Sequence, residues 1–222
     1  MGSTLIDGPP YGPGRRLVNA LGLPDEAVSI VNDRLFKTPL TDAVELGRWL
    51  AARFAIDPES TVREATALWQ AQIEEAWLVP GATEALHTLA EAEIPWVYVS
   101  NIWPPFYQGF LRHFPTEQQR PSFLSFRLGV SKPQPDIYRM ALQTLNIAPQ
   151  DAVMIGDTYQ NDIAPALALG MKTIWLLHRP DKETADLQAV AAGDAPAPDL
   201  TLQSIGDLRL EQLAGLNDAF GA

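Results

Sequence analysis

Residues 152–162 read Ala-Val-Met-Ile-Gly-Asp-Thr-Tyr-Gln-Asn-Asp, and their pattern indicates the class of fold. The first four residues are apolar, which is typical of a short strand buried on both faces of a parallel sheet. Gly156 ends the run, and the carboxylates of Asp157 and Asp162 follow it. Ligands bind outside the carboxyl ends of strands in open parallel sheets, so the stretch predicts a functional site as well as a strand.

Short apolar runs and helical patterns alternate through the second half of the chain. We expect strands at residues 96–99, 123–130, 152–155 and 173–177, with helices at 82–92, 106–114, 135–144 and 163–169. This alternation predicts a parallel sheet that is covered by helices on both faces.

The first half of the chain has a different pattern, in which apolar residues recur at helical spacing, as at Leu17, Ala20 and Leu21. Thr41-Asp42 and Asp57-Pro58 are typical helix starts. The sequence therefore predicts an α/β protein with an all-helical module at residues 13–79 and an α/β core formed by residues 1–12 and 80–222.

Composition excludes several classes of protein. The chain has 222 residues, a formal net charge of −11 and no cysteine, and 46% of it is hydrophobic. The acidic balance disfavours a nucleic-acid partner, and no apolar run approaches the ~20 residues that span a bilayer. The lack of cysteine excludes disulfides and thiolate metal sites and fits a cytoplasmic protein. The oligomeric state cannot be predicted from these features.

Polar residues follow three of the expected strands. They are Ser100 and Asn101, Lys132, and the pair Asp157 and Asp162. Each alone is also typical of a turn, a solvated loop or a helix cap. Together, a hydroxyl, an ammonium group and two carboxylates at neighbouring strand ends suit a phosphate group and Mg²⁺, which prefers oxygen ligands. Close behind the first pair, Trp103 is a candidate for lining the substrate cleft.

These strand ends carry a specific resemblance. The segments Val-Tyr-Val-Ser-Asn (97–101), Ser-Lys-Pro-Gln-Pro-Asp-Ile-Tyr (131–138) and Met-Ile-Gly-Asp-Thr-Tyr-Gln-Asn-Asp-Ile (154–163) resemble the second, third and fourth motifs of the haloacid dehalogenase-like (HAD) hydrolases. The resemblance covers most of residues 80–180, and the fourth motif is its most specific part.

The resemblance implies a Rossmann-like core with a helical cap, for which residues 13–79 have a suitable length. It also implies a Mg²⁺-dependent phosphatase that acts on a small phosphorylated metabolite through an aspartyl-phosphate. In such an enzyme Ser100 binds the transferring phosphoryl group, and Lys132 steadies the charge of the nucleophile and the phosphate. Asp157 coordinates Mg²⁺, and Asp162 supports the metal shell.

The family's first motif, Asp-x-Asp-x-Thr, is where the chain departs from the pattern. Residues 4–7, Thr-Leu-Ile-Asp, resemble the segment that begins with the threonine of this motif. In that register Gly2 replaces the second Asp, and the nucleophile precedes Met1, so we expect negligible phosphatase activity from these 222 residues. A rival register makes Asp7 the nucleophile, at the end of a short strand at residues 4–6.

Three alternatives stay open. The nucleophile strand belongs to a longer parent protein, or the chain is a non-catalytic binding or scaffold relative. The third alternative is a phosphonatase-like or dehalogenase-like hydrolase, because these enzymes also lack the second Asp. A phosphonatase needs a cap lysine, and Lys37 is the only lysine in the helical module. A dehalogenase needs no Mg²⁺, so the presence of Asp157 and Asp162 favours phosphoryl chemistry.

Overall fold

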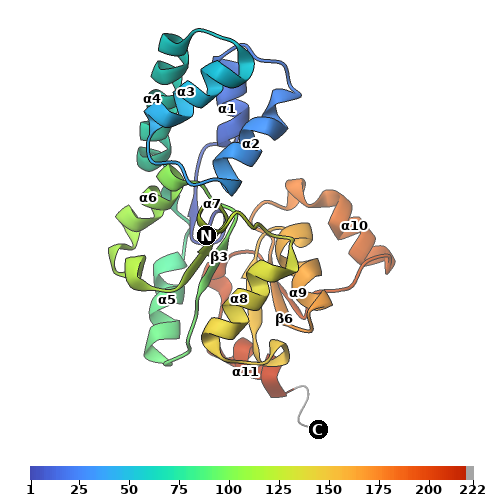
Figure 1. The fold of residues 1–222 in the computed structure, drawn as a ribbon. Coiled ribbons are helices and arrows are strands. Elements are labelled where there is room, and N and C mark those ends of the chain that lie inside the picture. Colours follow the sequence, from blue (N-terminus) through green and yellow to red (C-terminus); the bar gives the residue numbers. More distant parts are fainter. Residues whose placement is uncertain (219–222) are drawn as a thin grey trace. The chain divides into compact units, whose positions relative to one another are not determined.

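A computed structural model describes residues 1–218 of the chain, and their contacts divide it into two compact units. The unit that we call the α/β unit comprises residues 1–7 and 78–99 and the chain from Lys132 onward. The helical unit comprises residues 8–77 and 100–131. Figure 1 gives the element labels, and each unit is described by itself.

The α/β unit is built on a parallel sheet with the strand order β5 (Val153–Gly156), β6 (Lys172–Leu176), β7 (Leu200–Leu202). Val153 pairs with Lys172, and Ile174 pairs with Leu200. All five residues of β6 are buried, as expected for a central strand covered on both faces. The predicted parallel α/β fold is confirmed.

The remaining strands are short. The structure pairs β1 (Ile6–Asp7) with β2 (Trp77–Leu78), and β3 (Tyr98–Ser100) with β4 (Ser122–Leu124). Strands β3 and β5 belong to separate sheets, so β5 is an edge strand within the described chain. The strand expected at residues 123–130 is formed only at its start, because α7 (Ser125–Leu128) follows and Gly129 ends that helix with a φ of 68°.

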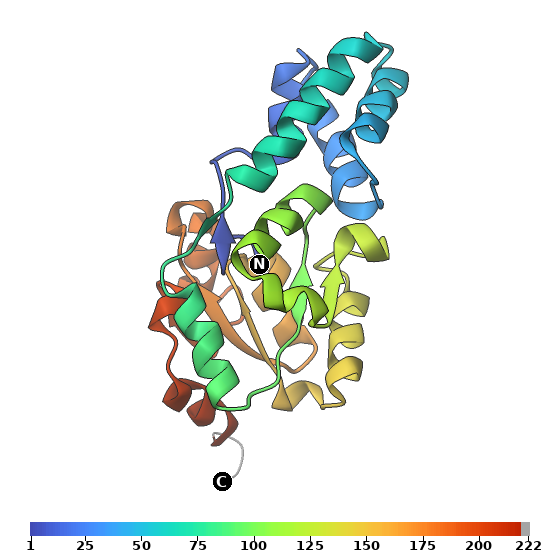
Figure 2. The ribbon, with the colours of Figure 1, turned by 90° about the vertical axis from the view of Figure 1, so that its left-hand side faces the viewer.

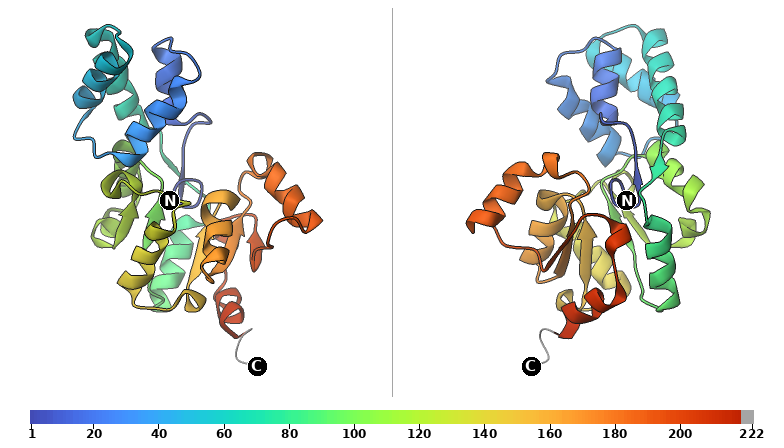
Figure 3. Two further views of the ribbon diagram at one scale, coloured as in Figure 1. Left: turned by 45° about the vertical axis from the view of Figure 1, so that its right-hand side comes forward. Right: turned by 180° about the vertical axis from the view of Figure 1, so that it is seen from behind.

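Helices flank the sheet of the α/β unit, with α8 (Pro135–Leu145) and α9 (Ala164–Ala168) on one face and α5 (Ala82–Glu91) on the other (Figures 1 and 3). Further elements are α10 (Thr184–Ala192), α11 (Leu210–Asp218) and the short helices η2 (Pro149–Asp151), η3 (Tyr159–Ile163), η4 (Pro180–Lys182) and η5 (Ile205–Asp207). Tyr159, Ile163 and Trp175 form a buried cluster where η3 packs on β6.

The helical unit contains α1 (Pro13–Ala20), α2 (Ala27–Lys37), α3 (Ala43–Phe54), α4 (Pro58–Glu74), α6 (Pro104–His113), η1 (Pro115–Gln119), β4 and α7. The long helix α4 is the teal helix in Figure 2. As predicted, Asp42 and Asp57 cap α3 and α4, accepting hydrogen bonds from the backbone N–H groups of Glu45 and Ser60.

The helical unit is larger than the predicted module, because residues 100–131 group with it rather than with the α/β core. The reason is the packing of α6 on α4. Gly109 faces the backbone oxygens of Gln72 and Ile73, where a Cβ would lie 3.1 and 3.2 Å from them. Trp103 is only 1% exposed, and its indole N–H donates a 3.0 Å hydrogen bond to Oε1 of Gln72. The ring of Trp103, expected near a cleft, therefore lies in the hydrophobic core of the helical unit.

No helix in residues 1–218 is both long enough and apolar enough to cross a membrane.

Replacing Trp103 by Phe tests this packing. Phe fills much of the same space but leaves the buried Oε1 of Gln72 without its donor, so we expect a loss of about 1–3 kcal/mol in the free energy of unfolding. Urea unfolding followed by circular dichroism measures it. The control is Trp77→Phe, because Trp77 is 48% exposed and its replacement should change stability by less than about 0.5 kcal/mol. Equal effects of the two substitutions would contradict the assignment.

Candidate active site

The loop that follows β5 carries both predicted metal carboxylates. Gly156 ends the strand, and a Cβ at this position would lie 2.3 Å from Cγ of Asp162, so only glycine leaves room for the Asp162 side chain. Asp162 lies in the π-helical turn η3 and accepts a 3.0 Å hydrogen bond from the backbone N–H of Thr158. The motif therefore folds Asp162 back against the end of the strand. π-Helical turns are frequent at functional sites.

Lys132 and Asp162 form a buried ion pair, in which Nζ of Lys132 contacts Oδ1 of Asp162. Their side chains are 10% and 3% exposed. Lys132 comes from the loop before α8 and Asp162 from the loop after β5, so the fold brings these two predicted site residues together. Each charge compensates the other in a place where an isolated charge would be costly.

Asp157 is also buried, and its cation is Arg179. NH2 of Arg179 donates a 3.1 Å hydrogen bond to Oδ2 of Asp157. Burial, and then the negative charge of Asp162, raise the pKa of the Asp157 carboxyl, while Arg179 opposes this shift. The two carboxylates therefore repel each other in a poorly solvated site.

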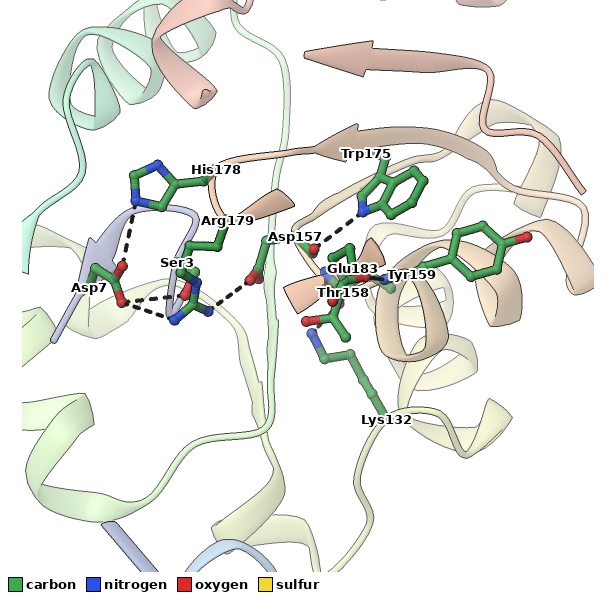
Figure 4. A network of polar contacts seen from close by, with 11 residues as sticks. Ser3, Asp7, Lys132, Asp157, Thr158, Tyr159, Trp175, His178, Arg179 and Glu183 are labelled. Carbon is green, nitrogen blue, oxygen red and sulfur yellow. Dashed lines mark hydrogen bonds and ion pairs between the residues drawn. The ribbon is translucent and has the colours of Figure 1, made fainter. Parts of the chain in front are cut away.

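Side chains from other elements hold the backbone of this loop in place (Figure 4). The indole N–H of Trp175, on β6, donates to the carbonyl oxygen of Asp157 at 3.2 Å. The buried carboxylate of Glu183 accepts a 2.7 Å hydrogen bond from the backbone N–H of Tyr159, and the hydroxyl of Tyr138 donates to the carbonyl oxygen of Asn161. The positions of Asp157 and Asp162 are thus fixed by β6, by α8 and by Glu183, which lies between η4 and α10, as well as by their own loop.

The site contains two residues that the sequence analysis did not assign to it, His178 and Arg179, together with Asp7, which only the rival register placed there. NH1 of Arg179 lies 3.6 Å from Oδ1 of Asp7, and Nε2 of His178 lies 3.5 Å from its Oδ2. Figure 4 shows Arg179 between Asp7 and Asp157. A signal was present, because His178 and Arg179 directly follow the expected strand at residues 173–177 and so stand at a strand end.

The first residues of the chain reach the same place. The amino group of Met1 is buried close enough to the site for its charges to act on it. Burial and the charge of Lys132 lower the pKa of this amino group to about 6, while Asp162 and Asp157 act in the opposite direction.

Residues 1–7 do not form the strand that the rival register expects at residues 4–6. The carbonyl oxygen of Met1 accepts hydrogen bonds from the N–H groups of Leu5 and Ile6 at 2.9 and 3.2 Å, which folds the segment into a turn. Ser3 adopts a positive φ of 56°, and only Ile6–Asp7 is a strand. Asp7 ends β1 with its side chain largely buried.

Ser100, Asn101 and Trp103 belong to the helical unit. Ser100 is the buried last residue of β3, and Asn101 is exposed. Just after them, the backbone N–H of Ile102 donates a 3.1 Å hydrogen bond to Oγ of Ser125, which fixes the start of this loop. The convergence of Ser100 and Asn101 with Lys132 stays a prediction, and the contacts of Trp103 are those of a core residue.

The donor chemistry of the site fits Mg²⁺. Over residues 1–218, no three or more His, Asp and Glu side chains are grouped so as to hold a metal ion. Mg²⁺ in proteins is commonly held by one or two carboxylates and completed by water and substrate phosphate oxygens. Asp157 and Asp162 supply two buried carboxylates whose mutual repulsion a cation would relieve. These two residues would hold the ion.

Parts of the chain are similar in sequence to known proteins. Residues 129–208 match the family model described as HAD-hydrolase-like. The chain is 47% identical over 47 residues to glyceraldehyde 3-phosphate phosphatase of Pyrococcus furiosus, covering 21% of this chain and 20% of that protein. It is 30% identical over 144 residues to ribulose-1,5-bisphosphate 5-phosphatase of Halopiger xanaduensis, covering 64% and 59%. The alignments thus span from a fifth to about three fifths of these relatives.

Solved structures share the fold over nearly the whole chain. A HAD family hydrolase of Deinococcus radiodurans with bound phosphate and sodium has a TM-score of 0.61 at 22% identity, covering 96% of this chain and 92% of that one. A 2-haloacid dehalogenase of Pseudomonas syringae has a TM-score of 0.63 at 22% identity, covering 96% and 94%. The family-model match and the curated relatives confirm the predicted resemblance to HAD-like hydrolases, and the solved structures show the same fold.

Replacing Lys132 by Met tests the buried ion pair. The substitution leaves the charge of Asp162 buried without its cation, so we expect unfolding to become easier by about 3–5 kcal/mol. The double variant Lys132→Met/Asp162→Asn should recover much of this loss, because the unpaired charge is gone. Lys182→Met, at an exposed lysine, is the matched control. Urea denaturation of all four proteins gives the energies, and a single variant as stable as the control would refute the pairing.

Replacing Asp157 by Asn tests its burial. The folded protein keeps Asp157 protonated to a higher pH than the unfolded chain does. Wild-type protein should therefore lose stability relative to Asp157→Asn as the pH rises from the ordinary pKa of a carboxyl through the raised one, with a constant difference above it. Thermal unfolding between about pH 3 and pH 7 measures this difference. A variant that is less stable than wild type at pH 7 would show that the pair with Arg179 outweighs burial.

Proposed function

We propose that the chain belongs to a Mg²⁺-dependent phosphatase that hydrolyses a small phosphorylated metabolite through an aspartyl-phosphate. One observation carries the proposal: Lys132 and Asp162 form a buried ion pair at the end of β5, where the carboxylate of Asp157 acts electrostatically on Asp162. Three curated proteins that are similar to parts of this chain are named as phosphatases of small phosphorylated compounds.

The site residues of the α/β unit have different roles in the proposed phosphoryl transfer. Lys132 supplies a positive charge to the nucleophile and the phosphate, and its pair with Asp162 fixes the ammonium group. When bound, Mg²⁺ would neutralise charge on the phosphoryl group. Asp157, Asp162 and the loop supports at Trp175 and Glu183 keep the carboxylates in place. The resemblance assigns the binding of a phosphoryl oxygen to Ser100, which groups with the helical unit.

The nucleophile in this proposal is an aspartate immediately before Met1. The register that aligns Thr4 with the threonine of the first motif demands this position. The carboxylate oxygen would attack phosphorus as the bond to the leaving oxygen breaks, and water would then hydrolyse the aspartyl-phosphate to inorganic phosphate. Gly2 supplies no acid at the second position of the motif, so the leaving oxygen takes its proton from water and turnover is slow.

A second candidate function is phosphate or metal binding without catalysis. Two observations favour it: Gly2 replaces the acid/base carboxylate, and the two metal carboxylates already hold Arg179 and Lys132. A third reading makes Asp7 the nucleophile, and its link to Asp157 through Arg179 places it in the same network.

The test compares three proteins with p-nitrophenyl phosphate and Mg²⁺. They are the 222-residue chain, the chain extended by a short apolar segment that ends in Asp before Met1, and the same extension ending in Asn. We expect hydrolysis only from the Asp extension, because only this protein has a carboxylate in the attacking position. Its rate should be roughly 10²–10⁴-fold below that of an enzyme with a positioned acid.

The other outcomes separate the alternatives. Hydrolysis by the 222-residue chain that disappears in Asp7→Asn would establish the Asp7 register. No hydrolysis by any of the three proteins, with Mg²⁺ and phosphate still bound, would support the binding function instead.

A further inference from the structure

Arg179 occupies the space between two carboxylates of the α/β unit. NH2 lies 3.1 Å from Oδ2 of Asp157, and NH1 lies 3.6 Å from Oδ1 of Asp7. Nε of Arg179 is buried and has no hydrogen-bond partner in the described chain. A buried N–H without an acceptor is costly, so this arrangement does not use the full donor capacity of the guanidinium.

The contact with Asp157 conflicts with a metal ion at the same carboxylate. Arg179 stabilises the negative charge of Asp157, as a divalent cation would. Lys132 holds Asp162 in the same way, so the site already contains two positive side chains beside its two carboxylates. A cation that binds Asp157 must therefore displace Arg179 or bear its repulsion at close range.

We infer that Arg179 competes with the divalent cation for Asp157 and, once displaced, binds an anionic group of the substrate. This inference rests on the metal and phosphate site of the proposed function and adds a residue outside the segments that resemble the family motifs. Arg179 would be a substrate-binding residue that pairs with the metal-binding carboxylate of Asp157 while no substrate is present.

Asp7 can hold the side chain of Arg179 after it leaves Asp157. Its longer contact of 3.6 Å with NH1 of Arg179 anchors the guanidinium near the ends of β1 and β6 after the contact with Asp157 is lost. The Arg179 side chain is 35% exposed and can turn without unpacking a core. A guanidinium presents a planar set of N–H donors that matches the oxygens of a phosphate or carboxylate.

The test measures Mn²⁺ binding, and then inorganic phosphate binding in the presence of Mn²⁺, by isothermal titration calorimetry. In Arg179→Gln we expect Mn²⁺ to bind roughly tenfold more tightly, because a competing charge is removed. Phosphate should bind at least roughly tenfold more weakly, because charge-assisted hydrogen bonds are lost. Arg179→Lys keeps the charge without the planar donors, so it should weaken phosphate binding while Mn²⁺ affinity stays near the wild-type value.

Opposite shifts are the signature, because general damage to the site would weaken both ligands together. Arg139→Gln is the matched control: Arg139 lies on α8 in the same unit, is exposed and pairs with Asp136, so neither affinity should change. If Arg179→Gln leaves both affinities unchanged, or moves them in the same direction, the inference is wrong while the proposed function stands. Wild-type protein that binds neither ligand would overturn both.

Discussion

The repulsion between Asp157 and Asp162 is the constraint on which the rest of the site depends. At the end of β5 Asp162 is buried and the side chain of Asp157 is 14% exposed, and burial together with this repulsion raises the pKa of Asp157. Each carboxylate is tolerated because a cation from another part of the α/β unit reaches it. Lys132 comes from the loop before α8 and Arg179 from the loop after β6, so two loops are held to the strand end by charge.

Side chains from other parts of the α/β unit also hold the backbone of the loop that carries Asp157 and Asp162. The carbonyl oxygens of Asp157 and Asn161 accept hydrogen bonds from the side chains of Trp175 and Tyr138, and the N–H of Tyr159 donates one to Glu183. Buried polar groups that are fully bonded specify one arrangement of a loop, because every alternative arrangement leaves a donor or acceptor unmet. This explains how a short segment can hold two like charges near each other without unfolding locally.

Structural features that depend on neighbouring residues in the chain could be predicted from the sequence. Short apolar runs gave the strands β5 and β6, and the caps Asp42 and Asp57 gave two helix starts. Prediction failed where distant contacts decide. The segment at 123–130 turns into α7, and Trp103 is drawn into a core by Gln72, which lies 31 residues away in the chain. The contact between Asp7 and Arg179 could not be predicted, because these residues lie far apart in the chain and meet only after folding.

The π-helical turn of η3 has a consequence for how related sequences are compared. The N–H of Ala164 bonds to the carbonyl oxygen of Tyr159, five residues earlier, so this turn holds one residue more than a turn of α-helix. The number of residues between Asp157 and Asp162 is therefore set by the geometry of this turn. An alignment that opens a gap inside it would pair Asp162 with a residue on a different side of the turn and would misread which relatives keep the second carboxylate.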